Sequence, residues 1–176
     1  MRSFGNCGGP GNTLSEPAAR EAFRDVIGHF ATGVTIVTAA DDGRHFGTTV
    51  SAVSSVSLEP PTLLVCLNRT SRTRDVVDRT RRFAVNILGV GQGDLARTFA
   101  TDRDDKFAGV GFELGLFGVP LLNDVVAHIE CTVRETATSG THTVFFGEVQ
   151  RAEPFEGEPI LYYRGQVGWP GSGRQP

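Results

Sequence analysis

The spacing of hydrophobic side chains changes from a helical to a strand pattern early in the chain. One apolar stripe, whose members lie three or four residues apart, predicts a helix over residues 18–30. The stripe consists of Phe23, Val26, Ile27 and Phe30. β-Branched residues at 33–38 then predict a strand, and Asp41-Asp42-Gly43 predicts a hairpin turn into a return strand over 45–50.

Further along the chain, strand patterns outnumber helical ones. A continuous apolar run at 63–67 predicts a strand that is buried on both faces. Two short helices are expected at 71–79 and 92–100, and the glycine-rich stretch 101–120 is expected to be mostly loop. Further strands are expected at 83–88, 125–133, 143–149 and 160–163. Because the strands do not alternate with helices, the pattern favours a mainly β fold, an antiparallel barrel, over a doubly wound sheet.

Residues 48–61 are unusually rich in small hydroxyl side chains. Six of these fourteen positions are Ser or Thr, interleaved with Val, Ala and Leu and ended by Pro60-Pro61. The hydroxyl residues are Thr48, Thr49, Ser51, Ser54, Ser55 and Ser57. A slim, polar surface of this kind is typical of a segment that hydrogen-bonds a flat ligand with polar edges.

A second group of polar residues follows the strand expected at 63–67. Ser71 and Thr73 lie at the start of a predicted helix. Hydroxyls and free backbone N–H groups at a helix start can bind a phosphate group, and nearby arginines can add charge-assisted hydrogen bonds. Helix capping beside a solvated basic face explains the same residues without a ligand. His142 precedes the strand expected at 143–149 and is a candidate for binding or protonating a ligand, although a surface histidine fits the same place.

Composition narrows the classes of function. A chain of 176 residues with 39% hydrophobic and 21% charged side chains suits one globular domain, here 18–168, between disordered tails at 1–17 and 169–176. The net charge of −3 gives no electrostatic argument for nucleic acid. No apolar run is long enough to predict a membrane span, so no membrane partner is expected.

The residues that usually mark metal or nucleophile sites are sparse. Three cysteines, Cys7, Cys66 and Cys131, form no CxxC pair, which predicts reduced thiols in the cytoplasm. The four histidines show no metal-ligand spacing, so no metal is expected. The segment 89–93 lacks the third glycine of a dinucleotide-binding loop and is interpreted as a strand-to-helix turn.

Three segments together carry a family resemblance. They are Phe30-Ala31-Thr32-Gly33-Val34-Thr35, Ser55-Val56-Ser57-Leu58-Glu59-Pro60-Pro61 and Phe83-Ala84-Val85-Asn86. With shorter pieces such as Asp105-Lys106-Phe107, they follow one another as in the short-chain flavin reductases, from about Phe23 to Gly165. The chain therefore resembles the reductase components of two-component flavin-dependent monooxygenases.

The resemblance implies a homodimeric split β-barrel that binds FAD or FMN. It implies that NADH or NADPH reduces the flavin, and that reduced flavin leaves to supply a separate monooxygenase. A non-catalytic flavin-binding module remains an alternative. A pyridoxamine-phosphate-oxidase-like split-barrel oxidase is another, although it needs a basic substrate-phosphate cluster, and the arginines here lie mostly near the predicted flavin phosphate.

The resemblance also implies which residues contact the cofactors. Residues 49–53 would line the isoalloxazine ring, mostly through backbone groups, whereas Ser54 and Ser55 would help to hold the ribityl–phosphate part. His142 matches a Gly-Asp-His segment near the nicotinamide, but Gly140-Thr141-His142 lacks the acidic residue, so His142 is expected to position rather than to act as a base. The complete set of predicted cofactor contacts is Thr32, Gly33, Val34, Thr49, Val50, Ser51, Ala52, Val53, Ser54, Ser55, Cys66, Asn68, Ser71 and Thr73.

Overall fold

The computed structural model describes residues 16–168. The predicted tails and Cys7 lie outside these residues, except that Glu16 and Pro17 begin the first helix. The helices are α1 (Glu16–Gly28), α2 (Arg72–Thr80) and α3 (Gly93–Phe99). The strands are β1 (Thr32–Gly33), β2 (Thr35–Asp41), β3 (Arg44–Val50), β4 (Val53–Leu58), β5 (Pro61–Asn68), β6 (Arg82–Ile87), β7 (Phe112–Leu114), β8 (Pro120–Leu122), β9 (Ala127–Ser139), β10 (His142–Pro154), β11 (Leu161–Tyr163) and β12 (Gln166–Gly168).

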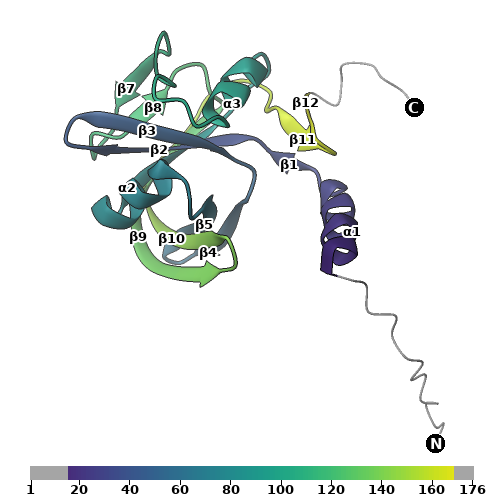
Figure 1. Ribbon diagram of the computed structural model, residues 1–176. Coiled ribbons are helices and arrows are strands. Elements are labelled where there is room, and N and C mark those ends of the chain that lie inside the picture. Colours follow the sequence, from purple (N-terminus) through teal and green to yellow (C-terminus); the bar gives the residue numbers. More distant parts are fainter. Residues whose placement is uncertain (1–15, 169–176) are drawn as a thin grey trace, which may run out of the picture.

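Seven strands form one antiparallel sheet in the order β3-β2-β6-β9-β10-β5-β4 (Figure 1). The two edge strands, β3 and β4, follow one another in the chain and are joined only by Ser51 and Ala52. The sheet must therefore curl until its edges approach one another. Within the described residues no ladder joins β3 to β4, so the curled sheet stays open along this line. The fold is mainly β with short helices, as the sequence predicts.

The first hairpin forms where the sequence predicts it. β2 and β3 pair antiparallel, with Asp41 opposite Arg44. The two turn residues, Asp42 and Gly43, have positive φ angles of 47° and 72°. Two positive φ angles match the twist of a two-residue hairpin, and a glycine adopts such an angle without a Cβ clash.

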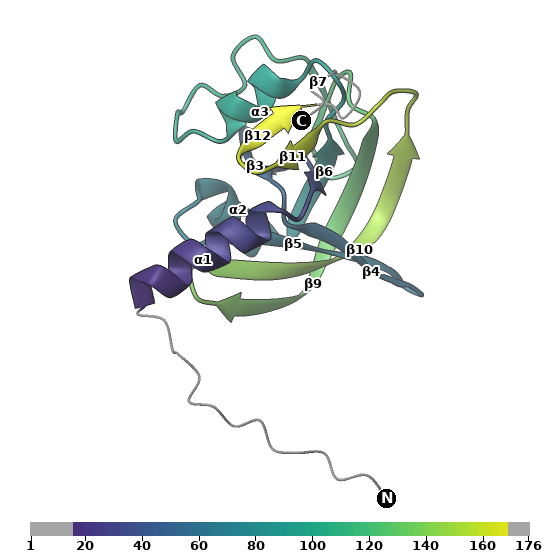
Figure 2. The same cartoon turned by 90° about the vertical axis from the view of Figure 1, so that its right-hand side faces the viewer.

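The long hairpin β9–β10 and the small hairpin β7–β8 differ from the sequence expectation. β9 and β10 each span 13 residues, well beyond the apolar runs at 125–133 and 143–149. Register shifts between Phe146 and Gly147 and between Val149 and Arg151 accompany the bend of these strands (Figure 2). The outer ends of both strands carry polar side chains, so the apolar pattern in the sequence underestimates the length of the strands. Residues 101–120, expected as loop, contain β7, which pairs with β8.

The hydrophobic core lies on the inner side of the curled sheet. Val37, Val65, Phe83 and Phe145 are fully buried there, and α2 packs on them through Val76 and Val77. A second cluster holds α3 against the sheet. It consists of Val34, Ile36, Leu88, Ala96, Phe99, Leu122, Val125 and Ile160.

The prediction that residues 63–67 are buried on both faces is wrong. Leu63, Val65 and Leu67 are buried in the core, whereas Leu64 and Cys66 on the other face are only partly covered. The outer face of β5 is therefore only partly covered within the described residues.

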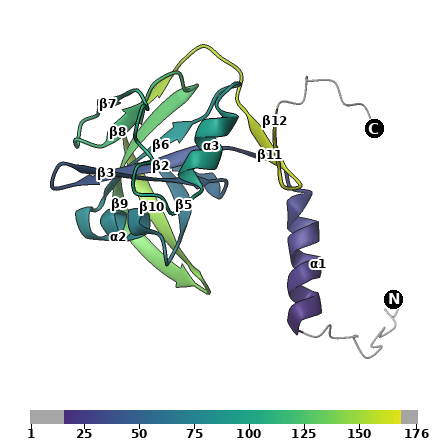
Figure 3. The ribbon, with the colours of Figure 1, turned by 45° about the horizontal axis from the view of Figure 1, so that its top comes forward.

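Helix α1 stands beside the curled sheet instead of packing on it (Figure 3). It meets the β11–β12 hairpin, where Arg164 N donates to Gly28 O at 3.0 Å. Its apolar stripe faces solvent: Phe23 and Val26 are 67% and 69% exposed, and Phe30, which lies just beyond the end of α1, is 69% exposed. No described helix is long and apolar enough to cross a membrane.

Candidate functional site

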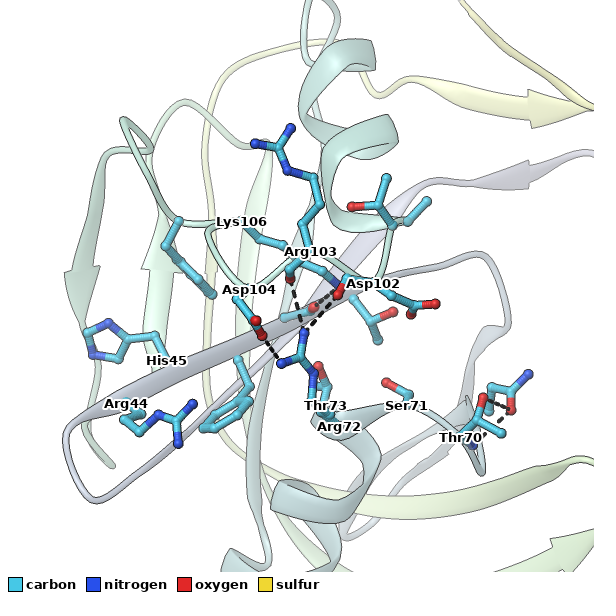
Figure 4. A pocket seen from close by; sticks show the side chains of 17 residues that line it. Arg44, His45, Thr70, Ser71, Arg72, Thr73, Asp102, Arg103, Asp104 and Lys106 are labelled. Atoms are coloured by element: carbon cyan, nitrogen blue, oxygen red, sulfur yellow. Dashed lines mark hydrogen bonds and ion pairs between the residues drawn. The ribbon is translucent and has the colours of Figure 1, made fainter.

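A cavity of about 560 Å³ lies between β3, the turn from β5 into α2, and the segment that follows α3 (Figure 4). Its walls combine hydroxyl, amide, cationic and aromatic side chains. They are contributed by Arg44, His45, Phe46, Gly47, Thr48, Asn68, Thr70, Ser71, Arg72, Thr73, Ala100, Thr101, Asp102, Arg103, Asp104, Lys106 and Phe107. The size and the mixed lining suit a small organic ligand with polar groups.

The turn between β5 and α2 is built by the local sequence. The Asn68 side-chain oxygen accepts hydrogen bonds from both the backbone N–H and the hydroxyl of Thr70, each at 3.0 Å. Ser71 N donates to Asn68 O at 3.0 Å, and α2 begins at the next residue. An asparagine that binds the backbone two residues ahead is a recurrent way to set such a turn. The turn thereby holds the start of α2 at the cavity.

The start of α2 has unused donors. Ser71 occupies the N-cap position, yet its hydroxyl makes no capping hydrogen bond. The first N–H groups of a helix have no intrahelical partner, and the helix dipole favours negative charge there. Ser71 and Thr73 both line the cavity, so this end of it suits a phosphate group.

The charges around the cavity favour an anion. Four of its side chains are cationic and two are carboxylates. The cations are Arg44, Arg72, Arg103 and Lys106, and the carboxylates are Asp102 and Asp104. Arg72 is ion-paired with Asp104 and donates to the backbone oxygens of Asp102 and Arg103 at 2.9 and 3.2 Å. The hydrogen bond from Arg72 lowers the pKa of the Asp104 carboxyl, so this carboxylate is ionised at neutral pH.

Three of the predicted cofactor contacts meet in this cavity, namely Asn68, Ser71 and Thr73. Two others point elsewhere. The Thr49 hydroxyl donates to Ala96 O at 2.6 Å, and Val50 is buried in the core. Thr48, which was not among the predicted contacts, lines the cavity instead.

The remaining hydroxyl-rich residues lie at the open line between the sheet edges. Ser51, Ala52, Ser54 and Ser55 are exposed, while Val53 packs against the core. None of them lines the cavity. Ala52 O accepts a hydrogen bond from Cys66 N at 3.0 Å, which places Cys66 beside this segment. Burial raises the pKa of the Cys66 thiol, so this cysteine is a poor nucleophile.

Thr32 and Gly33 form β1, which pairs with β11, and Val34 follows them into the core. The Thr32 hydroxyl is buried and has no hydrogen-bond partner in the described part of the chain. A buried hydroxyl of this kind normally bonds to a ligand or to water. It fits the prediction that this segment meets a polar ligand, although it does not line the cavity.

His142 begins β10 and stands opposite Asn68 of β5. Its ring nitrogen Nδ1 is 2.9 Å from the Thr141 hydroxyl, and the side chain is exposed. His142 therefore neighbours a cavity residue without lining the cavity itself. His128 lies 2.7 Å from Leu122 O and packs edge-on against Phe155, which indicates a structural role.

Sequence reasoning missed several cavity residues. His45, Phe107 and Phe112 pack ring against ring, with centroids 4.9 to 5.8 Å apart, and two of them line the cavity. Nothing in their spacing reveals this contact, because β3 and the segment after α3 are far apart in the chain. The sequence does single out Lys106, which is the only lysine in the 176 residues.

A second cavity, of about 670 Å³, lies near His128. It contains none of the predicted cofactor contacts. Four carboxylate residues line it, Glu113, Asp124, Glu153 and Glu156, against the single cation of Arg151. This charge disfavours a phosphate-bearing ligand, so the first cavity is the better candidate of these two.

Comparisons with known proteins give a consistent result. The sequence model described as "Flavin reductase like domain" matches residues 27–171. The reductase component of 4-nitrophenol 4-monooxygenase/4-nitrocatechol 2-monooxygenase from Rhodococcus opacus is 46% identical over 153 residues, which cover 87% of this chain and 82% of that protein. A flavin reductase (NADH) from Kitasatospora aureofaciens is 40% identical over 156 residues, 85% of this chain and 82% of that protein.

Solved structures with similar folds belong to the same group. Nitrilotriacetate monooxygenase component B from Mycobacterium thermoresistibile superimposes with a TM-score of 0.84 at 34% identity, over 92% of this chain and 93% of that one. An NADH:FAD oxidoreductase from Streptomyces globisporus, solved with NAD and FAD fragments, has a TM-score of 0.83 at 35% identity, over 92% of this chain and 99% of that one.

Proposed function

This chain belongs to the flavin reductase family, and we propose that it is an NAD(P)H:flavin oxidoreductase that supplies reduced flavin to a separate monooxygenase. The observation that carries this proposal is the cationic cavity at the start of α2, in a chain of this family. The partner oxygenase is inferred from the relatives that are named as reductase components of monooxygenases.

The residues of the cavity fit the phosphate of a flavin nucleotide. The free hydroxyl of Ser71 and the unpaired N–H groups at the start of α2 are donors that suit phosphoryl oxygens. The excess of cations over carboxylates supplies the complementary charge. We call the cavity formed around Asn68, Ser71 and Thr73 the phosphate end of the proposed flavin site.

The segment 51–55 is the proposed ring end of the site. The resemblance implies that Ser54 and Ser55 hold the ribityl–phosphate part, but neither lines the cavity, so we assign both to the ring end together with Ser51 and Ala52. β3 and β4 are the edges of the sheet, so backbone groups on their outer sides have no ladder partner in the described chain. Such groups suit the polar edge of a flat ring, and small side chains leave room for a second ring to stack on it. Thr32, whose hydroxyl is buried and unpartnered, is a further donor in this proposal.

The bound flavin supplies the chemistry, because it accepts hydride directly from the nicotinamide. The protein has to hold the two nucleotides, orient them and exclude water. No acid–base pair is required of it. We assign His142 to positioning the nicotinamide, since it stands at the strand end beside Asn68.

This assignment predicts the kinetics of a His142→Ala variant. Loss of a contact to the nicotinamide nucleotide should raise KM for NADH about threefold to tenfold, with little change in flavin affinity. Steady-state kinetics at saturating flavin, together with a flavin titration, measure both quantities. Unchanged NADH kinetics would make His142 a surface histidine.

We further propose that the open, curled sheet is a split barrel within a homodimer. α1 has 13 residues, a length at which an isolated helix is only marginally stable in water. Its exposed stripe and the exposed Val56 and Leu58 of β4 supply apolar surface that a second copy can cover. Burying each such side chain contributes about 1.5–3 kcal/mol.

The proposed activity is tested by rapid anaerobic mixing of the protein with NADH and either FAD or FMN. We expect flavin absorbance to bleach as NADH is oxidised, at a rate that depends on protein concentration. FAD and FMN run in parallel show which flavin is preferred, and NADPH in place of NADH shows which nucleotide is used. A protein that binds flavin without bleaching it would be a flavin-binding module and not a reductase.

A further inference from the structure

Lys106 is unusual both in its residue type and in its position. It is the only lysine among the 17 Lys and Arg residues of the chain, and it lies in the wall of the proposed phosphate end. Figure 4 shows it on the segment after α3, on the other side of the cavity from Ser71 and Arg72. The side chain is partly buried.

The Lys106 ammonium is fixed by two backbone oxygens. Nζ donates to Gly47 O at 3.1 Å and to Phe99 O at 3.2 Å. An ammonium has three N–H donors, so one remains beyond these two bonds. Because both carbonyls are neutral, they orient the group without balancing its charge.

Lys106 also lacks an ion-pair partner. Within residues 16–168 no carboxylate lies within 4.0 Å of its ammonium, whereas Arg72 and Arg103, in the same cavity, are paired with Asp104 and Asp105. Burial lowers the pKa of the Lys106 ammonium, and the charge of Asp102 only partly opposes this. A partly buried cation without a counter-ion is destabilised, and an anion bound in the cavity would relieve that.

We propose that Lys106 is an anion-binding residue that donates its remaining N–H to a phosphoryl group of a nucleotide held in this cavity. The inference rests on the proposed function and adds a residue to it. Two nucleotides offer the same chemistry, the flavin with its phosphate and the nicotinamide dinucleotide with its pyrophosphate. The flavin is favoured, because Lys106 shares the cavity with the start of α2.

A purely structural role makes a different prediction. If Lys106 only joins β3 to the end of α3 through Gly47 and Phe99, its loss loosens the cavity for every ligand alike. If it binds phosphate, its loss weakens only those ligands that carry the phosphate.

The test compares Lys106→Met with the wild type in binding oxidised FMN and riboflavin, which lacks the phosphate. We expect the variant to bind FMN about 10- to 100-fold more weakly and riboflavin as the wild type does. Arg97→Met is the matched control: it removes the same charge from an exposed residue of α3 outside the cavity, paired with Asp94. It should bind both ligands normally.

The outcomes separate the ligands and the roles. Normal flavin binding with a raised KM for NADH would assign the phosphoryl group to the nicotinamide dinucleotide. Equal losses for FMN and riboflavin, or no loss with any ligand, would overturn the inference. A wild-type protein that binds no flavin at all would overturn the proposed function, and the inference with it.

A second measurement needs no variant and no turnover. A lowered ammonium pKa makes a lysine more reactive to acylation, and Lys106 is the only lysine, so peptide mass analysis after brief acetylation reports on it directly. FMN should protect Lys106 and an equal occupancy of riboflavin should not. Equal reactivity with and without FMN and NADH would overturn the inference even if Lys106→Met failed to fold.

Discussion

The two ends of the proposed flavin site differ in how much of each a single chain builds. At the phosphate end, Asn68 fixes the turn between β5 and α2, and the start of α2 borders a cavity of about 560 Å³. At the ring end, Ser51, Ser54 and Ser55 lie exposed between two sheet edges. Under the proposed function, the phosphate end is preorganised within one chain, whereas the ring end would be completed by the ligand and a second copy.

The largest expected effect concerns the second copy. Phe23→Glu combined with Phe30→Glu places two charges on the exposed apolar stripe, one on α1 and one just beyond its end. If a partner covers these side chains, the change weakens the dimer by about 3–6 kcal/mol for each of its two protomers. Light scattering after size-exclusion chromatography should then find a dimer for the wild type and a monomer for the variant. FMN binding should fall as the ring end loses its cover.

Arg24→Glu is the control for this variant, because it makes the same change in net charge on α1 at a position outside the stripe. It should remain dimeric. A double variant with the same mass in solution as the wild type would mean that no second copy covers the stripe. The ring end would then have to be completed by the ligand alone.

The next largest effect is on stability, and it compares Gly47 at the phosphate end with Gly33 near the ring end. A Cβ on Gly47 would lie 2.5 Å from Cε1 of the fully buried Phe99 and 3.3 Å from Phe107, whereas nothing lies within 4 Å of a Cβ on Gly33. Gly47→Ala should therefore lower the free energy of unfolding by about 1–3 kcal/mol through overpacking. Gly33→Ala, next to the ring end, should change it by less than about 0.5 kcal/mol.

Chemical denaturation of the two glycine variants measures both free energies. Similar free energies of unfolding for the two variants would mean that the packing between β3 and α3 is no tighter than the packing around Gly33. The proposed contrast between a built and an open end of the site would then fail.

The sequence predicted several elements of the fold well, because local patterns encode them. The Asp42-Gly43 turn, the stripe of α1 and the start of α2 at Ser71 each follow from residues that are close in the chain. The full length of β9 and β10 was missed, since their outer ends carry polar side chains. The pairing of Lys106 with Gly47 joins residues far apart in sequence, and no spacing rule connects them.

The ligand-binding role of the hydroxyl-rich segment stays a prediction. Its composition is unusual, but composition does not tell which hydroxyls are used within the chain. Thr49 is bound to Ala96 O, and Ser57 is bound to Glu59, so neither is free. Only the three-dimensional arrangement separates Thr48, in the cavity, from Ser54, at the sheet edge.

The smallest expected effect is also the finest test of the two ends. A serine at an N-cap normally stabilises its helix by about 0.5–2 kcal/mol through a capping hydrogen bond, but the Ser71 hydroxyl makes none. Ser71→Ala should therefore leave the thermal midpoint nearly unchanged while it weakens FMN binding by about 1 kcal/mol, roughly fivefold.

Ser54→Ala is the matched change at the ring end. There the hydroxyl donates only to the neighbouring Ser55 O at 3.2 Å, and backbone groups are proposed to do most of the binding. It should alter FMN affinity by less than about 0.5 kcal/mol. Isothermal titration of both variants with FMN and riboflavin shows which end binds the phosphate. Riboflavin has no phosphate, so a substitution that removes only a phosphate contact weakens FMN binding and leaves riboflavin binding unchanged. A larger loss of FMN affinity in Ser54→Ala than in Ser71→Ala would move the phosphate from the start of α2 to the sheet edge.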